Sequence, residues 1–161
     1  MENYHIIDSN VLAIANELHA NANIECVTNT IEFLKNVKEN LESSEDFKIV
    51  LDDSYIVLGE YKSHDSIFTN KRIGSAFLKW LFTNLARTNI IMHNMPQDIE
   101  DDLELFPDCF ANFDRNDRKY LFLALQHNQQ NSTIHYGIDR GYQRFSACFQ
   151  EQNINLDEIC A

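Results

Sequence analysis

Four acidic residues carry most of the chemistry that the sequence offers: Asp8, Glu60, Asp117 and Asp139. Carboxylates that lie within a few ångströms of one another repel and raise one another's pKa, so such a cluster persists mainly when a cation neutralises it. Hard cations such as Mg²⁺ or Mn²⁺ suit sites made entirely of oxygen ligands. Together the acids predict a Mg²⁺ or Mn²⁺ site that serves phosphoryl chemistry.

Each acid taken alone has a simpler explanation. An Asp at the end of a strand or the start of a helix often caps free backbone amides. Asp8 and Asp139 each follow an apolar strand pattern, whereas Asp117 opens a helical pattern and Glu60 lies within one. Only their order along one α/β frame favours a shared metal site over separate caps.

Short apolar strands alternate with amphipathic helices along the chain. The predicted strands are 4–7, 48–52, 89–93, 133–139 and an edge strand at 153–159. The predicted helices are 11–20, 24–41, 54–61, 73–85, 116–127 and 142–151. This alternation predicts a three-layer α/β/α sandwich with a central, mostly parallel sheet of four to five strands, folded as a single domain over residues 1–161. Ligands of such sheets sit outside the carboxyl ends of the strands, where Asp8 is expected.

Length and composition narrow the class of protein. The 161 residues suffice for one domain with its own core. No apolar run approaches the roughly 20 residues that cross a bilayer, and the N-terminus lacks the features of a signal peptide. We therefore expect a cytoplasmic protein with no membrane partner. The cysteines have no metal-binding spacing and are expected to be reduced thiols at positions 26, 109, 148 and 160.

The charge of the chain is strongly negative but unevenly distributed. A formal net charge of -12 disfavours unguided attraction to nucleic acid. Residues 66–97 contain no acid, however, and include Lys71, Arg72, Lys79 and Arg87. This basic stretch is either an approach path for a polyanion or the solvated face of one amphipathic helix.

The motifs together resemble the PIN domain family of metal-dependent ribonucleases. Residues 6–10, Ile-Ile-Asp-Ser-Asn, are similar to the family's first motif, in which a strand delivers an Asp. Residues 49–54 followed by Glu60 are similar to its strand, hydroxyl residue and helical Glu. Residues 113–124 resemble the helix led by an Asp, and 134–139 resemble the last acidic strand. The resemblance covers nearly the whole chain.

This resemblance implies a Mg²⁺- or Mn²⁺-dependent endoribonuclease that acts on single-stranded or structured RNA. The implied metal ligands and catalytic residues are Asp8, Glu60, Asp117 and Asp139. The candidate RNA contacts are Asn10, Lys71 and Arg72. The family's usual roles are toxin of a toxin-antitoxin pair, RNA processing and defence against phage, so candidate partners are RNA, a regulatory protein and a second copy of the chain.

The chain departs from the family pattern near its last acid. Many relatives place a second acid two residues after the final one, where this chain has Gly141. Asp114 lies three residues before Asp117 and could replace that acid if both point inward, because helical neighbours at this spacing share a face. The alternative is that Asp114 only caps a helix.

Other polar residues compete for roles near the site. Glu32 is a rival to Glu60, although it precedes the second strand where the family motif follows it. Asp52 and Asp53 could support a ligand or cap the end of a strand. Asn10 could bind a ligated carboxylate or a phosphate, or could stabilise the start of a helix.

Two functions of other classes compete with the nuclease. A PIN-like fold with a degraded site could serve as a protein-interaction module, which Gly141 and the acidic surface favour. An aspartyl-phosphate receiver domain also begins with a strand-end Asp. The receiver is disfavoured because no second acid stands two residues after Asp8 and no Lys ends a late strand at the expected place.

Overall fold

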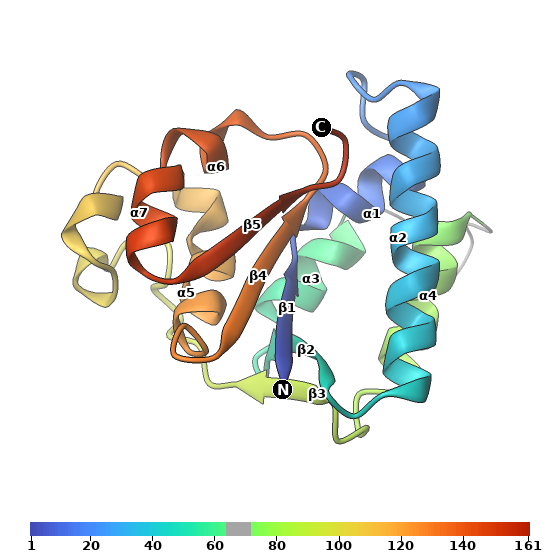
Figure 1. The fold of residues 1–161 in the computed structure, drawn as a ribbon, viewed down its shortest axis with the longest axis horizontal. Coiled ribbons are helices and arrows are strands. Elements are labelled where there is room, and N and C mark those ends of the chain that lie inside the picture. The colour runs from blue at the N-terminus through green and yellow to red at the C-terminus, as the bar shows by residue number, and fades with distance from the viewer. Residues whose placement is uncertain (64–71) are drawn as a thin grey trace.

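A five-stranded sheet forms the centre of the protein in the computed structural model, which describes residues 1–63 and 72–161 (Figure 1). All neighbouring strands run parallel, in the order β3-β2-β1-β4-β5. The strands are β1 Asn3–Ile7, β2 Phe47–Asp52, β3 Ile90–His93, β4 Asn131–Tyr136 and β5 Ile154–Glu158. The predicted α/β/α class is confirmed, and the last strand lies at an edge as expected.

Helices cover both faces of the sheet. Figure 1 shows α1, α2 and α4 on one side and α5, α6 and α7 on the other. Their bounds are α1 Ser9–Ala15, α2 Ile24–Ser43, α3 Ile56–Ser63, α4 Ile73–Thr83, α5 Arg118–Leu125, α6 Arg140–Arg144 and α7 Ser146–Glu151. Among the described residues, no helix is both long enough and apolar enough to cross a bilayer.

The central strand β1 creates the crevice that the acids border. It pairs with β2 on one side and with β4 on the other, where Ile7 lies opposite His135. The first three strands therefore extend the sheet from β1 toward one edge, and β4 and β5 extend it toward the other. The connections that follow β1 and β4 diverge at the carboxyl ends of these two strands. Ligands of open α/β sheets bind at such a switch point. Asp8 and Asp139 follow these two strands.

Helix α1 is shorter than the sequence predicts. It ends at Ala15 rather than residue 20, because the buried Asn16 side chain turns to helix α4 and bonds both the backbone N–H and the hydroxyl of Ser75. Glu17 then adopts a left-handed φ of 60°. A Cβ on Gly74 would stand 2.7 Å from the Leu12 carbonyl oxygen, so the close approach of α4 to α1 requires glycine there.

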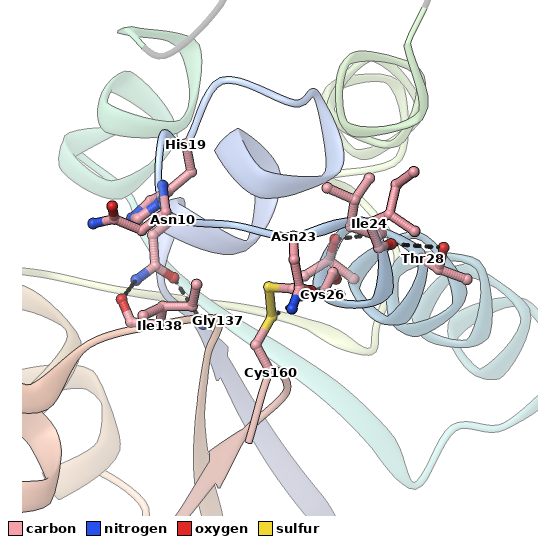
Figure 2. Close-up of a disulfide and its surroundings, with 12 residues drawn as sticks. Asn10, His19, Asn23, Ile24, Cys26, Thr28, Gly137, Ile138 and Cys160 are labelled. Carbon is pink, nitrogen blue, oxygen red and sulfur yellow. Dashed lines mark hydrogen bonds between the residues drawn. A yellow bond between two sulfur atoms is a disulfide. The ribbon is translucent and has the colours of Figure 1, made fainter.

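All four cysteines are paired, which corrects the expectation of reduced thiols. Disulfides join Cys26 to Cys160 and Cys109 to Cys148. Figure 2 shows the first of these joining the amino-terminal turn of α2 to the chain after β5. The partners are separated by 134 and 39 residues in sequence. Spacing along the chain therefore gave no sign that the fold brings them together.

Candidate metal centre

Three of the four predicted acids meet at the carboxyl edge of the sheet. Asp8, Asp117 and Asp139 each offer a carboxylate oxygen, and these oxygens all lie within 4.8 Å of one another. We call these three residues the carboxylate cluster. Within residues 1–63 and 72–161, no other group of three His, Cys, Asp or Glu side chains comes this close.

Local structure fixes the two strand-end acids of the carboxylate cluster. Asp8 is buried and caps α1, because its Oδ1 accepts the Asn10 backbone N–H at 3.0 Å. Its Oδ2 accepts the Tyr142 hydroxyl at 2.7 Å. Asp139 caps α6 by accepting the Gly141 backbone N–H at 2.7 Å. Both acids thus cap helices and also belong to the carboxylate cluster. The sequence offered capping and a shared metal site as alternatives, and the structure is compatible with both at once.

Asp117 reaches the carboxylate cluster from the other side of the crevice. It ends the 3-10 turn Arg115–Asp117, which immediately precedes α5. The sequence predicted one continuous helix from residue 116, whereas the structure begins that segment with the tighter turn. Asp114 is exposed and caps this turn, since its Oδ1 accepts the Asn116 backbone N–H at 2.9 Å. The capping interpretation of Asp114 is therefore the one that the structure supports.

Burial and mutual repulsion make the charges of the cluster costly. Burial chiefly raises the pKa of Asp8 to about 6, and the charges of Glu60 and Asp139 act in the same direction against the hydrogen bonds from Asn10 and Tyr142. Burial also raises the pKa of Asp117 to about 9, with further contributions from neighbouring carboxylates. Without a cation, Asp117 therefore keeps its proton at neutral pH, whereas Asp8 takes one up only in mildly acidic solution.

The donor set fits a hard divalent cation. All three groups present carboxylate oxygens, which are the ligands that Mg²⁺ and Mn²⁺ prefer. The three oxygens lie within 4.8 Å of one another, close enough for all three residues to contribute to one cation site. Displacing the proton that Asp117 retains would couple cation binding to pH.

Glu60 stands beside the carboxylate cluster rather than within it. It lies on α3, and its Oε1 is 3.0 Å from the Lys119 ammonium nitrogen. Its Oε2 accepts the Tyr120 hydroxyl. The charge of Glu60 raises the pKa of Asp8, which shows that the two carboxylates are neighbours. The sequence pattern predicted four equivalent ligands. The structure brings Asp8, Asp117 and Asp139 together and pairs Glu60 with Lys119.

Three residues that sequence reasoning did not single out organise this site. Tyr142 donates to Asp8, and Tyr120 donates to Glu60 while accepting the Ser9 backbone N–H at 3.1 Å. Burial raises the pKa of both phenols well above the usual value, so they stay protonated donors. Lys119 is the third of these residues. Each follows a cluster acid by two or three positions, but the two tyrosines resemble core residues in the sequence, and Lys119 resembles an ordinary polar residue of a helix.

Asn10 serves the fold rather than a free binding surface. Its side-chain amide donates to the Ile138 carbonyl at 3.3 Å, and its carbonyl oxygen accepts the Gly137 backbone N–H at 3.0 Å (Figure 2). These bonds fix the connection after β4 that carries Asp139. The structure thus gives Asn10 a role in positioning a cluster acid, and its role as an RNA contact stays a prediction.

The competing acids have other tasks. Both oxygens of Asp52 accept backbone N–H groups of α3, from Ile56 and Val57, so Asp52 is a helix cap. Asp53 is exposed and so is Glu32 on α2. The preference for Glu60 over Glu32 as the acid near the site is thus consistent with the structure.

Two arginines of the basic stretch lie among the described residues and have partners within the protein. Arg72 pairs with Glu17, while Arg87 donates to the Leu41 carbonyl near the end of α2 at 3.3 Å. Lys71 lies outside the described residues. Both arginines therefore have partners within the protein, and these contacts do not support an approach path for RNA.

The fold and the carboxylate cluster together define a parallel α/β protein with a candidate metal centre at its switch point. Comparison of the chain with models of protein families, with curated proteins and with solved structures found no match. The resemblance to PIN domains therefore rests on the quoted motifs and their order, and membership of that family is a proposal.

Proposed function

We propose that this protein is a Mg²⁺- or Mn²⁺-dependent nuclease of PIN-like architecture that hydrolyses phosphodiester bonds of RNA. The observation that carries the proposal is the carboxylate cluster, three oxygens within 4.8 Å at the carboxyl edge of a parallel sheet. RNA as the substrate comes from the resemblance of the motifs to PIN ribonucleases. The acids themselves indicate only phosphoryl chemistry.

In this proposal the chain's own residues hold and orient the cation. A bound Mg²⁺ or Mn²⁺ supplies a coordinated water of lowered pKa and a positive charge against the scissile phosphate. Asp8, Asp117 and Asp139 would hold it. The Tyr142 hydroxyl and the Asn10 N–H fix the two oxygens of Asp8. Such fixed carboxylates keep the donor set in place before the cation arrives.

The net charge of -12 fits an activity that depends on a partner. The negative field slows the capture of RNA at low salt, so a positively charged regulatory protein could supply the missing attraction, and a second copy of the chain is a further candidate partner. These partners, a cytoplasmic location and a role as toxin or phage-defence effector all belong to the proposal.

Disulfides usually persist in oxidising compartments. Trapping free thiols in intact cells, followed by mass spectrometry, would therefore test the location.

Two observations favour a second function, a catalytically degraded module that binds a protein partner. Glu60 is already neutralised by Lys119, and Gly141 stands where many relatives have another acid. A site that lacks these two acidic ligands could stabilise the fold without binding a catalytic cation. Such a module would neither bind Mn²⁺ nor cleave RNA.

The deciding experiment measures RNA cleavage and metal binding in the same preparations. The parent protein, Asp8→Asn and a matched control, Asp53→Asn, are incubated with total RNA in Mn²⁺ or in EDTA. We expect Mn²⁺-dependent cleavage by the parent and by the exposed-site control, and none by Asp8→Asn. Cleavage by Asp8→Asn at the parental rate would place the site elsewhere. A parent with neither cleavage nor an Mn²⁺-induced rise in melting temperature would favour the degraded module.

A further inference from the structure

Lys119 is a buried cation at the border of the carboxylate cluster. The residue is 4% exposed, and its ammonium nitrogen lies 3.0 Å from Glu60 Oε1. The ammonium also donates to the Asn116 carbonyl, within the turn that carries Asp117. Lysine is almost never buried to this extent without a paired charge, because desolvation of an ammonium is costly. The pairing with Glu60 is therefore what holds it there.

This pair connects directly to the backbone beside Asp8. The second oxygen of Glu60 accepts the Tyr120 hydroxyl, and that hydroxyl accepts the Ser9 backbone N–H at 3.1 Å. Glu60 is thus two hydrogen bonds away from the residue that follows Asp8. A carboxylate in this place could share a divalent cation with Asp8 if nothing else neutralised it.

Phosphoryl-transfer sites with two cations about 3.5–4 Å apart use one cation for the attacking oxygen and one for the leaving oxygen. Here an ammonium already occupies the position next to Glu60. Two positive centres that close to the same carboxylate would repel each other strongly. A second divalent cation at Glu60 would have to expel the buried Lys119 side chain.

We infer that Lys119 takes the place of a second divalent cation, so that the site binds a single ion on Asp8, Asp117 and Asp139 and leaves Glu60 as the partner of the ammonium. This inference rests on the proposed function and sets its stoichiometry. Lys119 acts as a positioning residue: it holds Glu60 away from the bound ion and neutralises its charge.

The stoichiometry of Mn²⁺ binding tests the inference without reference to catalysis. Titration calorimetry and equilibrium dialysis with metal analysis are carried out on the parent, Lys119→Met, and the double variant Lys119→Met/Glu60→Gln. Lys48→Met is the matched control, because Lys48 pairs with Glu2 at 3.6 Å at the opposite, amino end of β2. Circular dichroism shows whether each variant is folded.

We expect one Mn²⁺ per chain for the parent and for Lys48→Met. Lys119→Met should bind a second Mn²⁺, because Glu60 is then an unpaired carboxylate near Asp8. The double variant should return to one ion, since glutamine carries no charge. A parent that binds two ions, or a folded Lys119→Met that still binds one, overturns the inference while the proposed function stands.

A second measurement covers the case in which Lys119→Met does not fold. The double variant Lys119→Met/Glu60→Gln, which removes both charges of the pair, should keep one Mn²⁺ with an affinity close to that of the parent, because Glu60 is no ligand in this scheme. Loss of that ion in the folded double variant would show that Glu60 binds it directly and would overturn the inference. A parent that binds no Mn²⁺ at all would remove the proposed function and the inference with it.

Discussion

The Tyr142 hydroxyl donates a hydrogen bond of 2.7 Å to Asp8 Oδ2, and both side chains are buried. This bond joins α6, which follows Asp139, to the carboxyl end of β1. It therefore ties together the two segments that carry the strand-end acids of the carboxylate cluster. A bound cation would meet an Asp8 whose orientation is already set.

Tyr142→Phe removes this bond and leaves the ring in place. We expect Mn²⁺ affinity to fall about tenfold or more, as for other groups that orient a metal ligand. The metal-free protein should lose about 1–3 kcal/mol of stability, the usual cost of an unmade buried hydrogen bond. Calorimetry and urea unfolding measure the two effects. Tyr136→Phe is the control, because Tyr136 is also a buried residue, but its hydroxyl accepts the Gln143 side-chain amide in a partly buried bond away from Asp8. Equal losses in both variants would argue against a role for Tyr142 at the metal.

Asp117→Asn should stabilise the metal-free protein at alkaline pH. The pKa of Asp117 is raised to about 9 by burial and by the neighbouring carboxylates, whereas the unfolded chain releases this proton near pH 4. The folded state therefore binds more protons between these values, and stability falls as pH rises from about 4 to 9. Between about pH 6.5 and 9, above the range in which His5 acts, we expect the melting temperature of the parent in EDTA to decline and that of Asp117→Asn to decline less.

The same variant should lose its response to Mn²⁺. In the parent at pH 8, a saturating cation replaces the proton on Asp117 and raises the melting temperature. Asp117→Asn should show little of that rise, and the exposed-site control Asp53→Asn should show all of it. A full rise in Asp117→Asn would exclude this carboxylate as a ligand.

His5 should make the protein sensitive to acid. Its Nδ1 lies 2.8 Å from His135 Nε2, and His135 Nδ1 lies 2.7 Å from Asp157 Oδ2. Burial, with the neighbouring His135, lowers the pKa of His5 to about 3. As pH falls, His5 is protonated in the unfolded chain near pH 6.5 and in the folded protein only near pH 3. The free energy of unfolding therefore decreases as pH drops from about 6.5 to 3.

His5→Phe should reduce that acid dependence and keep the stacking on Phe47, whose ring centroid lies 4.0 Å away. Melting curves between pH 3 and 7 provide the measurement. His19→Phe, in the loop after α1, is the control and should follow the parent. If His5→Phe loses stability toward acid as steeply as the parent, other groups dominate the transition.

The two disulfides should contribute unequally to stability. Cross-links mainly restrict the unfolded chain, by about 2–5 kcal/mol for a native bond, and the effect grows slowly with loop length. The bond between Cys26 and Cys160 spans 134 residues, and that between Cys109 and Cys148 spans 39. We expect the paired Ser variants of the longer loop to lose about 1 kcal/mol more in urea unfolding. A larger loss of stability in the Cys109/Cys148 variant would show that packing in the native state, rather than the entropy of the unfolded chain, determines the contribution of each disulfide.

The sequence by itself determined the elements and the direction of the sheet. Apolar runs such as 49–51 are buried on both faces, and this pattern is typical of parallel strands between helices. Asp8 and Asp139 could be placed at strand ends because the apolar run before each stops at a polar residue. These features depend on neighbours in sequence, which is why local reasoning predicted them.

Only the tertiary structure decided which distant groups meet. The position of β1 between β2 and β4 brings Asp8 next to Asp139 and leaves Glu60 facing Lys119. The same packing joins Cys26 to Cys160 across 134 residues. Strand order and helix packing depend on burial summed over the whole core and not on local propensity. A lysine that reads as one more polar residue of a helix therefore becomes, in the folded protein, the buried counter-charge of a candidate metal centre.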